Sequence, residues 1–105
     1  MRRIPNTWYD RDCVRCPRLT EHLAVTAANH PHYHCRPVAP FGARRARLLI
    51  VGLAPGLHGA NATGRPFTGD HAGILLYETL YLLGIASTGQ SIDASDDLTP
   101  PDCRI

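Results

Sequence analysis

Two stretches of apolar residues predict the regular elements around which the chain is arranged. Residues 48–51 (LLIV) are continuously apolar and end at Gly52, a pattern typical of a strand buried on both faces of a parallel sheet. Residues 74–83 place Ile74, Tyr77 and Leu80 at helical spacing. Gly84 follows, and glycine is common just after a helix. We therefore predict a strand at 48–51 and a packed helix at 74–83.

A glycine-rich loop joins these two elements. Strand, loop and helix in this order form the first half of a parallel α/β unit, in which ligands bind beyond the carboxyl end of the strand. The loop concentrates polar side chains and one aromatic ring: His58, Asn61, Thr63, Arg65, Phe67, Thr68 and Asp70. We expect the functional site here.

Weaker signals surround this centre. Pro17 suits the first turn of a helix, with residues 19–29 as its body. Residues 86–101 have the composition of a loop, and residues 102–105 look like the start of a second strand. Before the helix, Trp8 and Tyr9 are expected to pack against the body of the protein.

Length and charge narrow the class of protein. A chain of 105 residues is one small domain at most. Residues 1–47 carry nine arginines and three acidic residues, whereas residues 48–105 carry two arginines and six acidic residues. The basic half suits phosphate contacts or a solvated surface. No apolar run approaches membrane-spanning length, and no signal peptide is evident, so we expect a cytoplasmic protein without membrane contact.

Four cysteines in a reducing compartment indicate metal or redox chemistry before disulfides. The C-x-x-C pair Cys13 and Cys16 is compatible with half a zinc site, half an iron–sulfur site or a redox pair, although a redox pair lacks its usual preceding strand. A zinc site could add His34 and Cys35, but adjacent residues cannot easily both turn to one ion.

Common nucleotide-binding loops fit the glycine-rich segment poorly. No G-x-G-x-x-G is present. Residues 59–64 match the front of a P-loop, but Arg65 and Pro66 replace its Lys-Ser/Thr. Without a lysine for the phosphates or a hydroxyl for Mg²⁺, an NTPase is excluded.

The segment GLAPG followed by HGAN-x-TGR-x-FTGD closely resembles the first active-site motif of the uracil-DNA glycosylase superfamily, in its B-type (family 5) iron–sulfur branch. The segments C-x-x-C-P-R-L and R-P-V-x-x-F-G are similar to that branch as well. The resemblance implies a three-layer α/β/α sandwich with a parallel sheet. It covers the N-terminal half of the family pattern, without the later cysteines and the late His motif. We therefore expect a truncated domain, with a cluster-binding segment at 1–42 and the first strand, active-site loop and helix at 43–105.

The resemblance also implies roles for individual residues. It assigns Asp70 as the catalytic carboxylate and Cys13 and Cys16 as the first two ligands of a [4Fe–4S] cluster. It implies base contacts from the following residues: Gly52, Leu53, Ala54, Gly56, His58, Asn61 and Phe67. The expected reaction is hydrolysis of the N-glycosidic bond of uracil or another deaminated base in DNA, by a protein that is monomeric when complete.

Plainer interpretations of the same residues stay open. Asp70 could be only a helix N-cap, and Phe67 only a core residue. Arg65 could hold a phosphate or form a surface salt bridge. At the level of function, the alternatives are a non-catalytic zinc or iron–sulfur nucleic-acid-binding module and an inactive glycosylase remnant.

Overall fold

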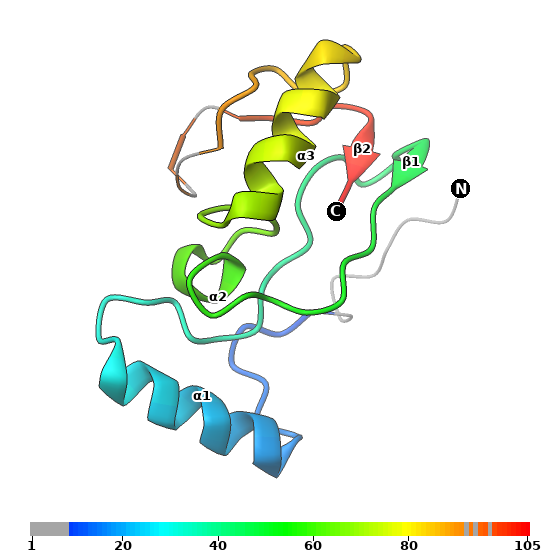
Figure 1. Ribbon diagram of the computed structural model, residues 1–105. Coiled ribbons are helices and arrows are strands. Elements are labelled where there is room, and N and C mark those ends of the chain that lie inside the picture. Colours follow the sequence, from blue (N-terminus) through cyan, green and yellow to red (C-terminus); the bar gives the residue numbers. More distant parts are fainter. Residues whose placement is uncertain (1–8, 92, 94, 97) are drawn as a thin grey trace.

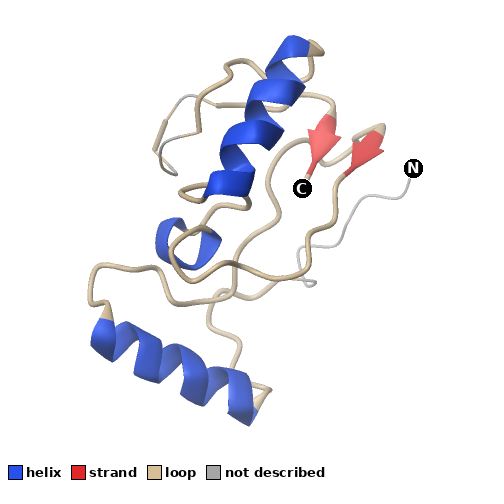
Figure 2. Cartoon of the chain, in the orientation of Figure 1, coloured by secondary structure: helices blue, strands red, loops and turns tan. Residues whose placement is uncertain are grey.

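A computed structural model describes residues 9–91, 93, 95–96 and 98–105 (Figure 1). The elements follow the order α1 (Pro17–Asn29), β1 (Leu48–Leu49), α2 (Ala60–Thr63), α3 (His71–Leu82) and β2 (Cys103–Arg104). Long connections join them (Figure 2). None of the helices in this part of the chain has the length and apolar character needed to cross a membrane.

Both long helices are confirmed. Helix α1 starts at Pro17, where a missing backbone N–H leaves no helical hydrogen bond unmade. Helix α3 starts three residues before the predicted position, because the Asp70 side chain caps it. After α3 the chain turns at Gly84, whose φ of +75° is the left-handed conformation expected there. Trp8 lies outside the described residues, whereas the Tyr9 hydroxyl donates a 3.0 Å hydrogen bond to the Pro37 carbonyl.

The predicted parallel pairing is also confirmed. Strands β1 and β2 are parallel neighbours, with Leu48 opposite Cys103 and Leu49 opposite Arg104. The N–H of Ile50 extends the ladder through a 2.8 Å bond to the Arg104 carbonyl. On the other side of β2, Phe41 and Ile105 exchange two backbone hydrogen bonds of 2.9 and 2.8 Å. The segment RPVAPFG therefore borders the sheet instead of only leading into it.

The prediction that residues 48–51 are buried on both faces is wrong for the described structure. Ile50 packs against the core, but Leu49 and Val51 are 64% and 81% exposed. Side chains alternate between the two faces of a strand. The core lies on the face of Ile50, and no described residue covers the face of Leu49 and Val51.

The core forms where α3 meets the segment that follows it. Tyr77 and Leu80 of α3 are buried together with Ala86 and Leu98. Phe41, Ile50, Phe67 and Ile105 are among the partly buried residues that pack around them. The segment 86–101 thus closes the core, although its composition resembles a loop. On the other side of α3, Leu75 and Leu82 are 70% and 75% exposed, so described residues cover only one side of the helix that was predicted to be packed.

Figure 1 shows α3 beside the two strands and α1 at the opposite end of the molecule, with α2 between them. A parallel pair with one helix packed against it is an α/β arrangement, as predicted. This arrangement places the carboxyl end of β1 next to the glycine-rich loop and the start of α3.

Candidate active-site loop

The loop after β1 contains a short helix that the sequence pattern did not reveal. Helix α2 follows Gly59 and is capped at its end by Gly64, whose φ is +79°. The carbonyl of Gly56 accepts bonds of 3.1 Å from the N–H groups of both Gly59 and Asn61, which closes the turn. Four residues are too few to show helical periodicity, so only the two flanking glycines could have signalled it.

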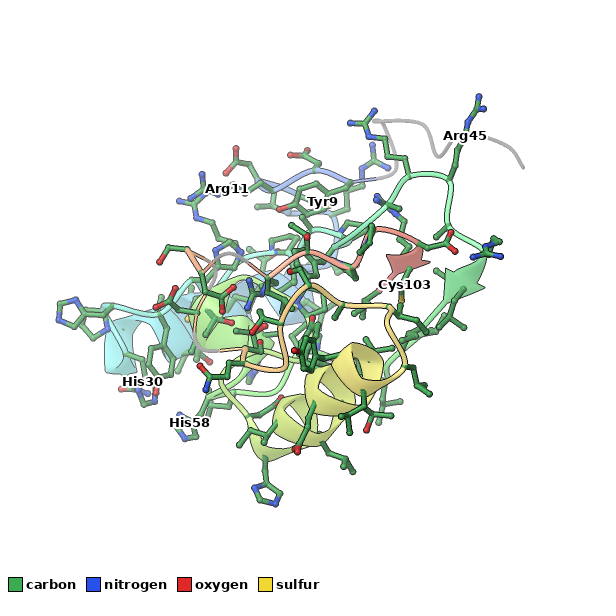
Figure 3. All side chains as sticks on the ribbon, turned by 90° about the horizontal axis from the view of Figure 1, so that it is seen from above. Tyr9, Arg11, His30, Arg45, His58 and Cys103 are labelled. Carbon is green, nitrogen blue, oxygen red and sulfur yellow. The ribbon has the colours of Figure 1, made fainter. Side chains whose placement is uncertain are left out.

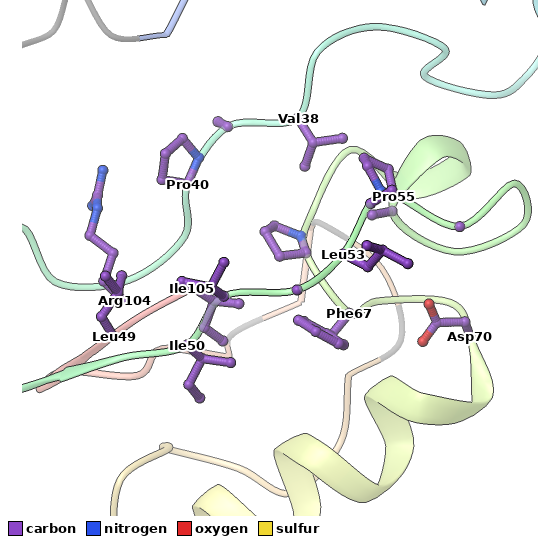
Figure 4. Close-up of a pocket in the computed structure, with 17 residues that line it drawn as sticks. Val38, Pro40, Leu49, Ile50, Leu53, Pro55, Phe67, Asp70, Arg104 and Ile105 are labelled. Atoms are coloured by element: carbon purple, nitrogen blue, oxygen red, sulfur yellow. The ribbon is translucent and has the colours of Figure 1, made fainter.

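A cavity of about 400 Å³ opens at the carboxyl end of β1 (Figure 4). Its lining includes most of the residues predicted for catalysis and base contact: Gly52, Leu53, Ala54, Gly56, Phe67 and Asp70. Val38 and Pro40 border it from the segment that runs beside β2. The structure therefore gathers the first and last parts of the loop around one space large enough for a small ring compound.

The two carboxylate oxygens of Asp70 lie in different environments. The Oδ1 atom accepts a 2.8 Å hydrogen bond from the Gly73 N–H and so caps α3. The Oδ2 atom faces Gly56 and Gly59: a Cβ would lie 3.6 Å from it at Gly56 and 2.4 Å from it at Gly59. Among the described residues no donor bonds Oδ2. The N-cap interpretation is thus confirmed, and one oxygen remains beside the cavity.

Phe67 combines a strained backbone with a tight fit. Its φ is +52°, in the left-handed region that is unfavourable for residues other than glycine. Its ring lies against Gly52, where a Cβ would stand 2.8 Å from the ring Cζ. The side chain is half-buried; it packs against the core and lines the cavity as well. The Phe67 ring is therefore both part of the core and part of the cavity wall.

The start of α3 approaches the Phe67 backbone very closely. A Cβ at Gly73 would lie 1.7 Å from the Phe67 carbonyl oxygen, well inside any permitted contact. Only glycine fits at this helical position, even though glycine destabilises a helix interior by about 1 kcal/mol relative to alanine. The loop and the first turn of α3 are packed without space between them.

Arg65 is a buried cation: the predicted salt bridge is present, but it lies in the interior and not at the surface. A contact with phosphate stays a prediction. The Arg65 residue surface is only 4% exposed. Two guanidinium nitrogens bond the carboxylate of Asp96 at 2.6 and 2.8 Å, and Nε donates to Thr68 Oγ1 at 2.8 Å. The rings of Phe41 and Tyr77 lie 5.0 and 5.9 Å from the guanidinium carbon. Sequence reasoning missed Asp96, because the partners are 31 positions apart.

The fully buried Tyr77 fixes the same loop from the helix side. Its hydroxyl donates a 2.7 Å hydrogen bond to the carbonyl of Pro66. Burial, which disfavours the phenolate, raises the pKa of Tyr77 to about 12, although the nearby Thr68 and Arg65 lower it somewhat. The hydroxyl therefore stays protonated, and remains a donor, throughout the physiological range.

Two predicted base-contacting residues do not line the cavity. His58 is exposed, and its Nδ1 lies 2.8 Å from the Tyr33 hydroxyl, with the His30 ring 5.5 Å away (Figure 3). Asn61 is buried, and its side-chain amide donates to the Leu57 carbonyl at 3.2 Å and to Cys35 Sγ at 3.5 Å. A contact from either residue to a base stays a prediction.

The four cysteines occupy two different environments. Cys13 and Cys16 are exposed free thiols that line a second cavity of about 470 Å³, with Leu19 and Leu23 of α1. Cys35 and Cys103 are buried. No group of three or more potential metal ligands is assembled among the described residues, so the zinc set of Cys13, Cys16, His34 and Cys35 is not formed. Two thiols at one cavity fit half of the donor set of a [4Fe–4S] cluster.

Comparison with known proteins places this loop in a family. The family model described as "Uracil DNA glycosylase superfamily" matches residues 39–101. A type-5 uracil-DNA glycosylase of Mycobacterium bovis is 46% identical over 100 residues, which are 89% of this chain and 37% of that protein. The protein of the same name from Pyrobaculum aerophilum is 39% identical over 102 residues, which are 88% of this chain and 45% of that protein.

A further relative, from Thermus thermophilus, carries the same name and is 44% identical over 89 residues, 80% of this chain and 41% of its own. The chain thus spans about two fifths of the length of these relatives. The matched region, residues 39–101, includes β1, the whole glycine-rich loop and α3.

Proposed function

The chain belongs to the uracil DNA glycosylase superfamily, and on that premise we propose that the full-length protein hydrolyses the N-glycosidic bond of uracil or a related deaminated base in DNA. The observation that supports this most strongly is the meeting of the Asp70 carboxylate, the Phe67 ring and the backbone of residues 52–56 around one cavity. Neither a carboxylate nor an aromatic ring alone would favour this reaction over others.

In this proposal the target base leaves the DNA stack and enters the cavity. Extrusion from a duplex takes a few kcal/mol. Stacking on Phe67 offsets part of that, by about 1–3 kcal/mol. The glycine backbone at Gly52 and Gly56 allows base and main chain to approach closely. Leu53 leaves this stretch without a polar side chain that could activate water, so that role falls to Asp70.

The Asp70 carboxylate acts where charge develops. As the bond between the sugar carbon and the base nitrogen breaks, positive charge grows on the sugar and the electron pair leaves with the base. The Oδ2 atom, free of the helix cap, stabilises the cation and orients a water. The water oxygen bonds to the sugar carbon, and its released proton balances the negative charge on the base. The products are the free base and an abasic sugar.

Several further statements belong to the proposal. The complete domain is a three-layer α/β/α sandwich, with 1–42 as the cluster-binding segment and 43–105 as the first strand, loop and helix. Cys13 and Cys16 hold two positions of a [4Fe–4S] cluster that stabilises the N-terminal segment and takes no part in hydrolysis. The substrate is uracil-containing DNA, and the full-length protein is a cytoplasmic monomer. The paired thiols at one cavity support the cluster, and the relatives' names support the substrate.

A direct assay tests the proposal. Full-length protein is incubated with an oligonucleotide carrying one uracil, and released uracil and alkali-labile abasic sites are measured. We expect both products in equal amounts, with none from the matching thymine oligonucleotide. DNA binding without base release would favour the non-catalytic module, and a protein that neither binds nor reacts would favour the inactive remnant.

A further inference from the structure

The buried network around Arg65 has no assigned role in the reaction, yet it surrounds the strained residue of the site. Arg65 and Thr68 flank Pro66 and Phe67 in sequence, and the Nε of Arg65 bonds Thr68 Oγ1 at 2.8 Å. The bond between the two side chains closes a small loop of chain that encloses Pro66 and Phe67. The conformation of Phe67 therefore depends on how firmly its two ends are held.

The outer end of the network is fixed by a distant segment. Asp96 bonds Arg65 through both oxygens, and Ser91 Oγ lies 3.0 Å from Nη2 of Arg65 and 2.8 Å from Thr68 Oγ1. A paired, planar contact of this kind fixes orientation as well as distance. Because the Arg65 charge is buried, removing its partner would leave an uncompensated charge, which is strongly unfavourable. Ser91 and Asp96 thus hold the Arg65 end of the loop in place.

The inner end of the network resists relaxation. The carbonyl of Pro66 accepts from both the Tyr77 hydroxyl, at 2.7 Å, and Thr68 Oγ1, at 3.1 Å. The carbonyl of Thr68 accepts from Thr63 Oγ1 at 3.0 Å. Residues in strained conformations persist only where their surroundings over-determine them, and they concentrate at functional sites. Phe67, with a φ of +52°, meets this description.

We propose that Arg65, anchored by Asp96 and Ser91, is a positioning residue that holds Phe67 in its left-handed conformation, so that the ring stays against Gly52 with a face available for the extruded base. This inference rests on the proposed function. It assigns the segment after α3 a part in base recognition, although no residue of that segment lines the cavity among the described ones. Arg65 acts through Phe67 and makes no contact with substrate.

The test is a double-mutant cycle in the full-length protein, with single-turnover release of uracil as the readout. We expect Arg65→Lys to lower the rate roughly 10- to 100-fold, since small misplacements at a site have effects of this size. In a Phe67→Ala background the same change should have almost no further effect, because the residue through which Arg65 acts has lost its ring. Independent, multiplicative losses would overturn the inference.

Arg47→Lys is the matched control. Arg47 also pairs with an aspartate, Asp102, but this pair is at the surface and neither residue lines the cavity. We expect it to keep the wild-type rate. If Arg65→Lys does not fold, Ser91→Ala removes only one anchor of the network and should show the same dependence on Phe67 with a smaller loss.

Amide hydrogen exchange separates this inference from the proposed function. In Arg65→Lys the Gly73 amide, which bonds Asp70 Oδ1 and packs against the Phe67 carbonyl, should exchange faster than in the wild type, while the amides of α1 should not change. Wild-type exchange at Gly73 would overturn the inference whatever the activity. A wild-type protein that releases no base would contradict the proposed function, and the exchange experiment then decides the inference by itself.

Discussion

The Asp70 Oδ1 atom and the Gly73 N–H are joined by a 2.8 Å hydrogen bond, and this bond makes the capping role of Asp70 separable from its proposed chemical role. Asparagine caps helices about as well as aspartate does, whereas alanine loses about 1 kcal/mol. Asp70→Asn should therefore keep the melting temperature but lower base release by roughly 10²- to 10⁴-fold, the usual contribution of a positioned acid or base. Single-turnover assays and thermal melts of the full-length protein measure the two effects.

Asp70→Ala completes this comparison. It should show the same loss of rate together with a lower melting temperature, and DNA binding should persist in both variants. Unchanged turnover per folded molecule in Asp70→Asn would show that Asp70 is only a cap.

Phe67→Ala should slow processing of the extruded base by about 1–3 kcal/mol, the energy of one base stacked on an aromatic ring. Phe67→Gly removes the same ring but also relieves the left-handed backbone, which disfavours a side chain by roughly 1–2 kcal/mol. The two variants should therefore have similar rates, with the glycine variant more stable. A lowered melting temperature with a normal rate in Phe67→Ala would assign the ring to the core alone.

Gly59→Ala should impair base release more than folding. The new Cβ would lie 2.4 Å from Asp70 Oδ2 and 2.9 Å from its Cγ, so the carboxylate must move. We expect roughly a 100-fold loss, typical of a displaced catalytic group. Gly84→Ala is the control, because its Cβ would meet nothing within 4 Å and its φ of +75° makes it strained as well. It should lower stability without lowering the rate per folded molecule.

The raised pKa of Tyr77, about 12, makes a prediction for alkaline solution. In the unfolded chain a tyrosine titrates near 10. The stabilisation linked to the buried neutral hydroxyl is therefore complete below pH 10 and is lost as the pH rises from 10 towards 12. Denaturant titrations across this range should show the fall in the free energy of unfolding. Tyr77→Phe, which removes the ionisable group, should show a smaller fall.

The cysteine environments predict a colour test that does not depend on activity. Full-length protein purified without oxygen should be brown with broad visible absorption, and Cys13→Ser or Cys16→Ser should weaken or abolish that absorption. Cys103→Ser should retain it, because burial among the strands raises the pKa of the Cys103 thiol and separates it from the exposed pair. Loss of colour in Cys103→Ser alone would place that residue in the cluster.

The sequence predicted those features of the fold that depend on interactions between residues close together in the chain. Pro17, the Asp70 cap and Gly84 define helix ends through short-range effects, and the apolar run at 48–51 correctly located a parallel strand. The motif located the cavity because most of its residues follow one strand in sequence and therefore meet at the end of that strand.

Long-range relationships could not be predicted in this way. The pairing of Arg65 with Asp96 joins positions 31 apart, and nothing near either residue marks it. The Asn61 side chain points inward, towards Cys35 and Leu57, because of its position in helix α2. This helix has four residues and is too short to show helical periodicity in the sequence. Exposure of Leu49 and Val51 depends on which elements lie above them, and an apolar run carries no information about that.

No space is left between Gly73 and the Phe67 carbonyl, so motions of the loop and of the start of α3 are coupled. Phe67 cannot swing inward while the first turn of α3 is formed, and that turn cannot shift towards the loop without displacing Phe67. Opening of the loop and fraying of the helix start are therefore one cooperative event, not two independent fluctuations. Any ligand that stacks on Phe67 would slow both motions. The first amides of α3 would then exchange more slowly when the cavity is occupied, although they do not line it.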